Sequence, residues 1–472
     1  MASIPLPAIE RDHPASRPAP PLAAPGQRYG AARLSAFGSL EVPAWGAELA
    51  IALFVPQIYA SHYGIPLAAL GIILFLVRLW SVVTDPIVGA LSDRSRTRFG
   101  RRKPWIAGGG LLFGLASIAL FFPPTAPGPL YLAATLFVYT IGWTMIEVPS
   151  WAWAGEVSGD YHERTRIMTY QQVLRSIGLL LILVLPTLID RGSAAAPNVK
   201  LHVSGAFVLA TLLPTLLLTL SALPEPALPS QSHHRIGFWR TATIVFRDRL
   251  LLRVLASDLA VTAGQSIRAG LIAFFCISYM GLAQWASGLY LLQFVFGVVA
   301  GPLWLAIGRR LGKRETAITG ELVQAAINIG LLAVFPDTLW LLVALAVAQG
   351  LTQGSGNLML RAMVADVADA HELATGHNRT GLFFSVFSLA TKAGPAIGIG
   401  LALPLLAWVG FRPGGHSAPA ALEALKYVFA LGPAAAHIIS AALIWHFPLD
   451  QTRHAAIRRA LDTRTASVPV EA

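Results

Sequence analysis

The sequence predicts an all-α polytopic membrane protein of twelve transmembrane helices, and three observations indicate this class. Hydrophobic residues make up 55% of the 472 residues and charged residues only 12%, about half the charged share of a typical soluble domain. The apolar residues fall in blocks of about 20, the length that crosses ~30 Å of hydrocarbon as a helix. Blocks such as 111–122 and 179–185 do not alternate between apolar and polar residues, which favours helices over a closed barrel.

Apolar blocks and turn signals divide the chain into two groups of six spans. The spans are predicted at 38–62, 66–90, 104–123, 129–153, 168–190 and 204–223, then at 252–280, 285–307, 315–334, 338–361, 380–409 and 423–446. The domains expected are a disordered cytoplasmic tail at 1–35, an N-terminal six-helix bundle at 36–224, a cytoplasmic linker at 225–250, a C-terminal six-helix bundle at 251–447 and a cytoplasmic tail at 448–472. Residues 1–33 are rich in Pro and Ala and have no apolar core, so they are expected to be a tail and not a signal peptide.

Lysine and arginine gather in alternate connections, which predicts how the chain is oriented. The segments 94–103, 235–249 and 309–314 are rich in these residues, whereas 123–129 and 336–338 contain none. Because basic connections stay in the cytoplasm, both termini are expected there, in a multi-pass protein of the bacterial inner (plasma) membrane. The net charge of +11 does not indicate nucleic-acid binding, since the basic residues lie between hydrophobic blocks.

The two halves repeat each other weakly. Asp85-Pro86 followed by Gly100-Arg101-Arg102 in the first half matches Gly301-Pro302 followed by Gly312-Lys313-Arg314 in the second. Repeated halves of six helices are typical of alternating-access carriers, which bind their substrate between the halves at mid-membrane.

Ionisable side chains occur inside the predicted spans, where each costs several kcal/mol unless it has a partner, water or a function. They are Glu48, Arg78, Asp85, Glu147, Arg175, Asp258, Arg268, Glu321 and Lys392. A structural ion pair remains an alternative for each of them.

Span four carries a row of aromatic and acidic residues, Tyr139, Trp143, Glu147 and Trp151, at helical i+4 spacing. Aromatic rings can lie on the apolar face of a sugar while a carboxylate accepts hydrogen bonds from its hydroxyls. A buried Lys392 needs a carboxylate, and Glu147 is the candidate across the two halves. Protonation that breaks this pair would couple proton uptake to substrate binding, and a static pair that orients helices is the alternative.

Two motifs resemble a known family. The first is Asp85-Pro86-Ile87-Val88-Gly89-Ala90-Leu91-Ser92-Asp93-Arg94 with the following segment 98–105, and the second is Ala365-Asp366-Val367-Ala368-Asp369 with Arg379 and Lys392. They are similar to the glycoside–pentoside–hexuronide cation symporters of the major facilitator superfamily, which include melibiose permease. The likeness runs from span one to span twelve and implies two pseudo-symmetric six-helix bundles.

The resemblance, together with the row on span four, gives each candidate residue an expected role. Substrate binding is assigned to Glu147, Trp151, Trp143, Glu48 and Arg175; cation coupling to Asp85, Glu147 and Lys392; and a cytoplasmic gate to Asp93, Arg94, Arg101, Arg102, Asp366 and Arg379. Arg175 is three residues beyond Gln172, where the family's arginine would fall, so its assignment stays open.

One departure from the family bears on the coupling ion. Members like melibiose permease have an aspartate four residues before the Asp-Pro, where this chain has Ser81. A site with one carboxylate fewer holds Na⁺ less well, so H⁺ is the expected coupling ion ahead of Na⁺.

The sequence therefore predicts a cation-coupled, and by preference proton-coupled, symporter of a glycoside or other small sugar. It is expected to be a monomer in the lipid bilayer, with no cofactor, no metal, no nucleic-acid partner and no enzyme activity. Two alternatives remain: a carrier of a lysolipid or other amphipathic solute, and a membrane sensor or assembly protein that does not transport. The identity of the sugar stays open.

Overall fold

The computed structural model describes residues 28–158, 160–192, 197–225, 244–377, 379–415 and 417–466. Within these ranges the chain forms helices and no strand, apart from a single bridge between Thr97 and Gly100. Twelve helical stretches are long and apolar enough to cross a membrane. The predicted all-α class and the number of spans are confirmed.

The first six spans make up the N-terminal half. They are α1 (Ala31–Gly38) with α2 (Glu41–Ser61), then α3 (Leu67–Arg94), α4 (Lys103–Phe121), α5 (Pro129–Glu156), α6 (Tyr161–Gly192) and α7 (Pro197–Ala222).

The second six spans make up the C-terminal half. They are α9 (Arg249–Phe274) with the π-helical turn η1 (Phe275–Tyr279), η2 (Ala283–Trp285) with α10 (Ala286–Leu311), α11 (Lys313–Gly330) with η3 (Leu331–Ala333), α12 (Leu339–Thr352) with α13 (Ser355–Thr375), α14 (Thr380–Trp408) and α15 (Pro419–Ile444). A further helix, α16 (Gln451–Ala466), follows the last span.

The chain departs from its predicted boundaries at the N-terminus and in span ten. Helix α1 starts at Ala31, and Leu34 is fully buried, so the predicted tail of 1–35 is too long at its end; 1–27 lie outside the described residues, as do 226–243 of the predicted linker. Span ten extends to Thr375 and is broken between α12 and α13, where Gly354 has a φ of 85°. A side chain with a Cβ rarely adopts that conformation, which explains a glycine at the break.

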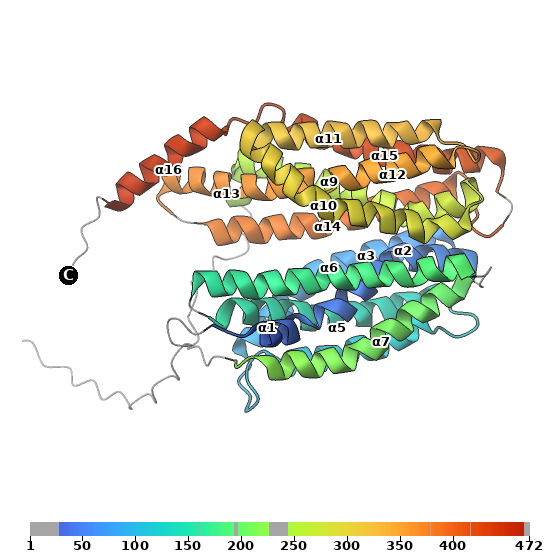
Figure 1. Cartoon of the computed structure of the whole chain (residues 1–472), viewed down its shortest axis with the longest axis horizontal. Coiled ribbons are helices and arrows are strands. Elements are labelled where there is room, and N and C mark those ends of the chain that lie inside the picture. The colour runs from blue at the N-terminus through green and yellow to red at the C-terminus, as the bar shows by residue number, and fades with distance from the viewer. Residues whose placement is uncertain are drawn as a thin grey trace, which may run out of the picture.

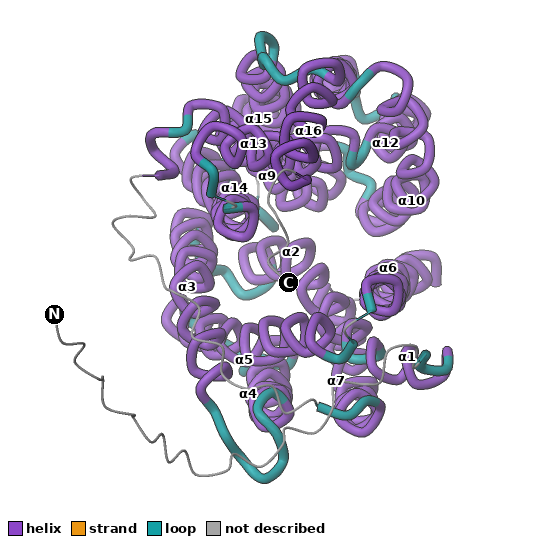
Figure 2. The backbone as a smooth tube through the Cα atoms, turned by 90° about the vertical axis from the view of Figure 1, so that its left-hand side faces the viewer, coloured by secondary structure: helices purple, strands orange, loops and turns teal. Residues whose placement is uncertain are grey.

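The two halves lie side by side, with the N-terminal half in blue to green and the C-terminal half in yellow to red (Figure 1). Viewed along the helices, they form two groups that face each other (Figure 2). We call the end with the connections 95–102 and 309–314 the basic end, and the other the opposite end. Helix α16 lies at the basic end, to the left in Figure 1.

The halves are held together near the opposite end. A Cβ on Gly71 of α3 would lie 2.5 Å from Cδ of Pro404 in α14, and one on Gly400 would lie 2.9 Å from Cβ of Phe75. Glycine at these positions lets the two helices approach closely.

The buried apolar residues also show that the two halves are joined near the opposite end. One hydrophobic cluster joins the N-terminal half to C-terminal residues at the opposite end, such as Phe274, Leu403 and Phe429. A separate cluster, with Leu251, Met363 and Phe383, lies at the basic end of the C-terminal half alone. The halves therefore share an apolar core at the opposite end and have separate cores at the basic end.

Candidate functional site

A cavity of about 730 Å³ lies between the two halves, a volume within the usual range for small-molecule sites. Its wall comes from α2, α3, α5 and α6 on one side and from α9, α13 and α14 on the other. Lys392 lies at its inner part, and Trp151, Arg361 and Phe384 line it near the basic end. The Trp151 side chain is 42% exposed. The cavity thus extends from the middle of the bundle toward the basic end.

Lys392 and two carboxylates join the halves inside this cavity. The Nζ of Lys392 donates hydrogen bonds to Oδ2 of Asp85 and, over 3.2 Å, to Oε2 of Glu147. Thr144 donates from Oγ1 to Oδ1 of Asp85 over 2.9 Å, and Trp143 donates from Nε1 to Oε2 of Glu147 over 3.2 Å. The contact predicted between Glu147 and Lys392 is present, and Asp85, assigned with them to cation coupling, shares the same ammonium. We call Lys392, Asp85 and Glu147 the central triad.

The central triad has one positive and two negative charges when all three groups are ionised. The Glu147 side chain is 4% exposed, and those of Asp85 and Lys392 are 14% and 27% exposed. An uncompensated charge in such a sheltered place is costly, so the triad is suited to hold one more positive charge. A bound proton or a small cation would supply it.

A second ion pair and a stacked arginine line the N-terminal wall. Glu48 of α2 pairs with Arg78 of α3. The guanidinium of Arg175 lies 3.2 Å from the ring centre of Trp45, in a cation–π contact. The predicted binding residues Glu48 and Arg175 are thus both at the cavity. The structure shows what holds each of them.

Sequence reasoning missed Trp45 and Glu41. Trp45 packs edge-on against Trp143 with 5.0 Å between the ring centres. Glu41 is buried and shares a small cavity with Trp45, Trp143 and Glu147. It was overlooked because it lies near the predicted start of span one, where charged residues are common. Its spacing of seven residues from Glu48, two helical turns, was the available signal.

The row predicted on span four lies on one face, because Tyr139, Trp143, Glu147 and Trp151 all line the cavity. Tyr139 is buried and its hydroxyl has no hydrogen-bond partner among the described residues. A buried hydroxyl is normally satisfied, so it is available to a water or a ligand in the cavity.

The C-terminal wall adds polar residues that had no assigned role. Asp258 of α9 accepts a hydrogen bond of 2.7 Å at Oδ2 from Oγ1 of Thr391, whereas its Oδ1 is buried without a described partner. Asn357 and Arg361 of α13 also line the cavity. Asp258 stood among the ionisable residues of the spans, but no partner could be named from sequence. Arg361 lies at the predicted end of span ten, and basic residues are common at the ends of membrane spans, so the sequence did not mark it as a cavity residue.

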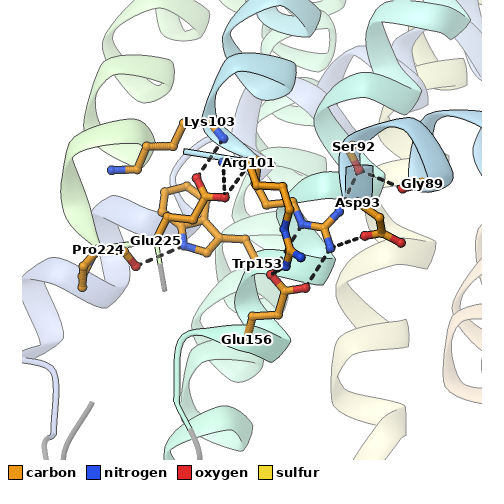
Figure 3. A network of polar contacts seen from close by, with 10 residues as sticks. Gly89, Ser92, Asp93, Arg101, Lys103, Trp153, Glu156, Pro224 and Glu225 are labelled. Atoms are coloured by element: carbon orange, nitrogen blue, oxygen red, sulfur yellow. Dashed lines mark hydrogen bonds and ion pairs between the residues drawn. The ribbon is translucent and has the colours of Figure 1, made fainter. Parts of the chain in front are cut away.

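A charged network lies at the basic end of the N-terminal half, where Figure 3 shows Ser92, Asp93 and Glu156. Arg102 contacts all three of them. Arg102 is 3% exposed and donates to Oγ of Ser92 and Oε1 of Glu156, each over 2.7 Å, and pairs with Oδ1 of Asp93 at 2.5 Å. Burial lowers the pKa of Arg102, but Glu156 and Asp93 outweigh burial and hold that pKa above its ordinary value. Arg101 pairs with Glu156 at 2.8 Å.

Glu225, just after α7, completes this network. Its Oε1 accepts the backbone N–H groups of Arg101 and Arg102 at 2.6 and 2.5 Å (Figure 3). These contacts fix the start of α4 against the end of α7. Neither Glu156 nor Glu225 was assigned a role from sequence.

The remaining predicted gate residues are held differently. Asp366 pairs with Nζ of Lys313 at 2.6 Å and with His454 of α16 at 3.2 Å. Arg379 contacts Nε2 of His371 over 3.3 Å. Arg94 is exposed, and no partner is described for it.

The described ion pairs at the basic end do not join the two halves, and the predicted gate stays a prediction. Every ion pair that the structure describes at the basic end joins residues of the same half. The physical reason is that the halves are apart here, so each charged residue pairs with the nearest opposite charge of its own bundle. The pairs brace each half where the cavity is open.

Comparisons with known proteins agree with this architecture. A Synechocystis protein named as an uncharacterized symporter is 26% identical over 85% of this chain and 91% of its own length. The glucuronide carrier protein homolog of Escherichia coli is 25% identical over 88% of this chain and 91% of its own. The human sodium-dependent lysophosphatidylcholine symporter 1 is 23% identical over 83% of this chain and 78% of its own.

Among solved structures, the nucleoside transporter NupG shares the fold. It has a TM-score of 0.64 and 12% identity, covering 88% of this chain and 98% of its own. The family model described as MFS/sugar transport protein matches residues 36–451. The chain belongs to this family, and it is a membrane transporter and not an enzyme.

Proposed function

We propose that the protein is a symporter that takes up a glycoside together with a proton across the inner membrane of a bacterium. The observation that carries the proposal is the central triad at the inner part of an aromatic-lined cavity between the halves. The basic end faces the cytoplasm, with both termini on that side. Because one chain supplies the whole cavity, a monomer is the working unit.

The charge of the central triad supplies the coupling. A proton bound by Asp85 or Glu147 makes the triad neutral. Closing the cavity removes water from these groups, and a net charge costs more in the enclosed state than in the open state. The enclosed state is therefore favoured when the triad is protonated, and it carries proton and substrate together.

The sugar has chemically suitable walls on both sides. Trp143 and Trp151 line the N-terminal wall, and Phe384 and Phe387 line the C-terminal wall. Aromatic side chains suit the apolar side of a pyranose. The Glu147 carboxylate accepts hydroxyl hydrogen bonds when it is not fully engaged by Lys392. Binding of a sugar and pairing of the triad thus compete for the same oxygens.

The local contacts of Ser81 support H⁺ over Na⁺. Its hydroxyl donates over 2.7 Å to the carbonyl oxygen of Arg78 in its own helix. The carboxylates that contact Lys392 are those of Asp85 and Glu147. A proton needs one carboxylate, whereas a bound metal cation needs several oxygen ligands.

An amphipathic cargo is the second candidate, and the human relative's name motivates it. The cavity has charged groups at its inner part and the apolar residues Leu358, Phe384 and Phe387 toward the basic end. A lysolipid could place its head group on the former and its chain along the latter. Flux of a fluorescent lysolipid that persists in Trp151→Ala would favour this candidate.

The test is gradient-driven uptake into proteoliposomes of the purified protein. We expect at least one mono-, di- or oligosaccharide from a labelled panel to accumulate when the inside is alkaline, without Na⁺, and to leak out when a protonophore is added. Glu147→Gln should abolish accumulation. The matched control Glu423→Gln, whose carboxylate lies outside the cavity and contacts Tyr279 of its own half, should retain it. No proton-driven accumulation of any sugar would contradict the proposal and would favour the lysolipid carrier or a protein that senses without transport.

A further inference from the structure

A second buried acid lies inside the C-terminal half, away from the central triad. Oε2 of Glu321, on α11, lies 2.5 Å from Nδ1 of His437, on α15. Both residues are 1% exposed. A methyl group on Gly356 of α13 would overlap Oε1 of Glu321. The absence of a side chain at Gly356 thus makes room for the Glu321 carboxylate.

The contact between Glu321 and His437 contains at least one proton, because two bare acceptors would repel each other at this distance. If it holds one, the pair is a neutral imidazole with a carboxylate and has a charge of minus one. If it holds two, the pair is an imidazolium with a carboxylate, or an imidazole with a carboxylic acid, and is neutral. The structure around the pair decides between one and two protons.

The surrounding charges favour the second proton. Besides Lys392, which belongs to the central triad, and Arg361, which lines the open cavity, the charged residues toward the centre of this half are Arg268 and Asp258 of α9. Both are buried. The charge of Arg268 balances only one of the two carboxylates, those of Asp258 and Glu321. A buried set with a net charge of minus one costs several kcal/mol, so the set is stable with one further proton.

A small polar pocket lies beside His437 and gives this proton a hydrated environment. Arg268, Gln293, Gln349 and His437 line it, and its volume is about 30 Å³, which is room for about two water molecules. Arg268 Nε, Gln293 Oε1 and Gln349 Oε1 are buried without described partners. Such atoms are normally satisfied by ordered water when a polar space is large enough.

The polar pocket connects with the central cavity through two amides. Gln265, another residue of its wall, donates from Nε2 to Oδ1 of Asn357 over 2.8 Å. Asn357 lines the central cavity. Side-chain amides and the waters between them can relay a proton from the cavity to His437.

Apart from Arg268 and His437, the described residues that line this pocket carry no charged side chain. The helix α10 contributes the phenol of Tyr290 to the pocket, and α12 contributes the amide of Gln349. At Glu321 the helix α13 presents the backbone of Gly356. The charged group in the pocket beside the pair is thus Arg268, whereas Asp258, also on α9, lines the central cavity.

We propose that Glu321 and His437 form a proton-binding site within the C-terminal half, separate from the central triad and reached from the central cavity through Gln265 and Asn357. Its ligand is an exchangeable proton. The site binds and releases that proton as the pH changes, whereas a purely structural pair keeps the same proton content throughout.

The test is pH-difference infrared spectroscopy on the full-length protein in liposomes, with no sugar present. The pH is changed from about 4 to about 9, which covers the ordinary titration of carboxyl and imidazole groups. We expect Glu321→Gln and His437→Gln each to remove titrating carboxyl or imidazole bands that the wild-type protein shows. A potentiometric titration of the same samples should show about one exchangeable proton fewer per chain.

The matched control is Ser440→Ala. Ser440 lies on the same helix as His437 and its hydroxyl is 2.7 Å from that of Ser257, so the change removes a buried hydrogen bond without an ionisable group. It should retain the bands. If a single variant does not fold, the double variant Glu321→Gln/His437→Gln, in which two amides can hydrogen-bond, carries the test. Difference spectra that are the same in the wild-type protein and in the folded variants would overturn the proposal.

Because this readout uses no sugar, it stands or fails independently of the proposed transport activity. Sugar uptake without the titrating bands would overturn the proton site alone. Titrating bands without proton-driven uptake of any sugar would contradict the proposed function alone.

Discussion

Arg102 and Arg94 belong to the same basic connection and look equivalent in sequence, but the structure separates them. Arg102 is 3% exposed and contacts Ser92, Asp93 and Glu156. Arg94 is exposed, and no partner is described for it. Replacing each by Met keeps much of the side-chain volume and removes the charge. We expect Arg102→Met to destabilise the protein strongly and Arg94→Met to leave it nearly unchanged.

The magnitude follows from how sheltered each contact is. Removing one member of a buried ion pair costs about 3–5 kcal/mol, because the partner is left uncompensated. The Asp93 side chain is 54% exposed, so its pair adds under about 1 kcal/mol. Glu156 is 19% exposed and keeps Arg101 at 2.8 Å, which points to the lower end of the range. The loss for Arg102→Met is therefore about 3 kcal/mol, and for Arg94→Met within about 0.5 kcal/mol.

The assay is the temperature at which half of the detergent-purified full-length protein is lost from the monodisperse peak in size-exclusion chromatography. For a unit the size of one half, about 3 kcal/mol corresponds to a fall of about 6–12 °C. An equal fall for Arg94→Met, or no fall for Arg102→Met, would refute the assignment of the network to Arg102.

Three further predictions test other parts of the structure. Gly142→Ala should destabilise the protein by about 1–3 kcal/mol in the same thermal assay, because its Cβ would lie 2.5 Å from the backbone N of Phe113. The control Gly155→Ala, with open space around the new Cβ, should not destabilise it. Equal midpoints for the two variants would contradict this. Lys392→Gln should lower proton-driven uptake at least about tenfold by leaving two sheltered carboxylates unpaired, and wild-type uptake would exclude a role for the ammonium. Backbone N–H groups, first that of Glu163, hold the pKa of Asp160 below its ordinary value. The carboxylate therefore stabilises the fold above the unfolded-state pKa, and this contribution is lost as the pH falls through the folded-state pKa. Asp160→Asn should make stability depend less on pH in the acid range, and an unchanged pH dependence would count against this.

The spans could be predicted from the sequence because the bilayer sets the length of an apolar helix. Contacts inside the spans were partly predictable for a similar reason: Lys392 in an apolar helix needs a carboxylate, and few lie in the other spans. The pair with Glu147 and the shared face of Tyr139 and Trp151 follow from charge balance and helical spacing.

The ends of the helices were much less predictable. Glu156 and Glu225 lie where charged residues are common, so nothing in their surroundings marks them as partners of Arg101 and Arg102. The choice of Arg102 over Arg94 depends on the path of the connection at 95–102, which turns between Thr97 and Gly100.

The central claim is that the triad of Lys392, Asp85 and Glu147 couples the proton to the sugar. The most direct test measures two activities of Asp85→Asn in the same proteoliposomes: exchange of labelled for unlabelled sugar without a gradient, and accumulation driven by a proton gradient. Because the variant retains Glu147 and the aromatic wall but lacks a carboxylate that binds Lys392, we predict that exchange continues and accumulation fails. Accumulation by Asp85→Asn to the wild-type level, with the same proton dependence, would contradict the account.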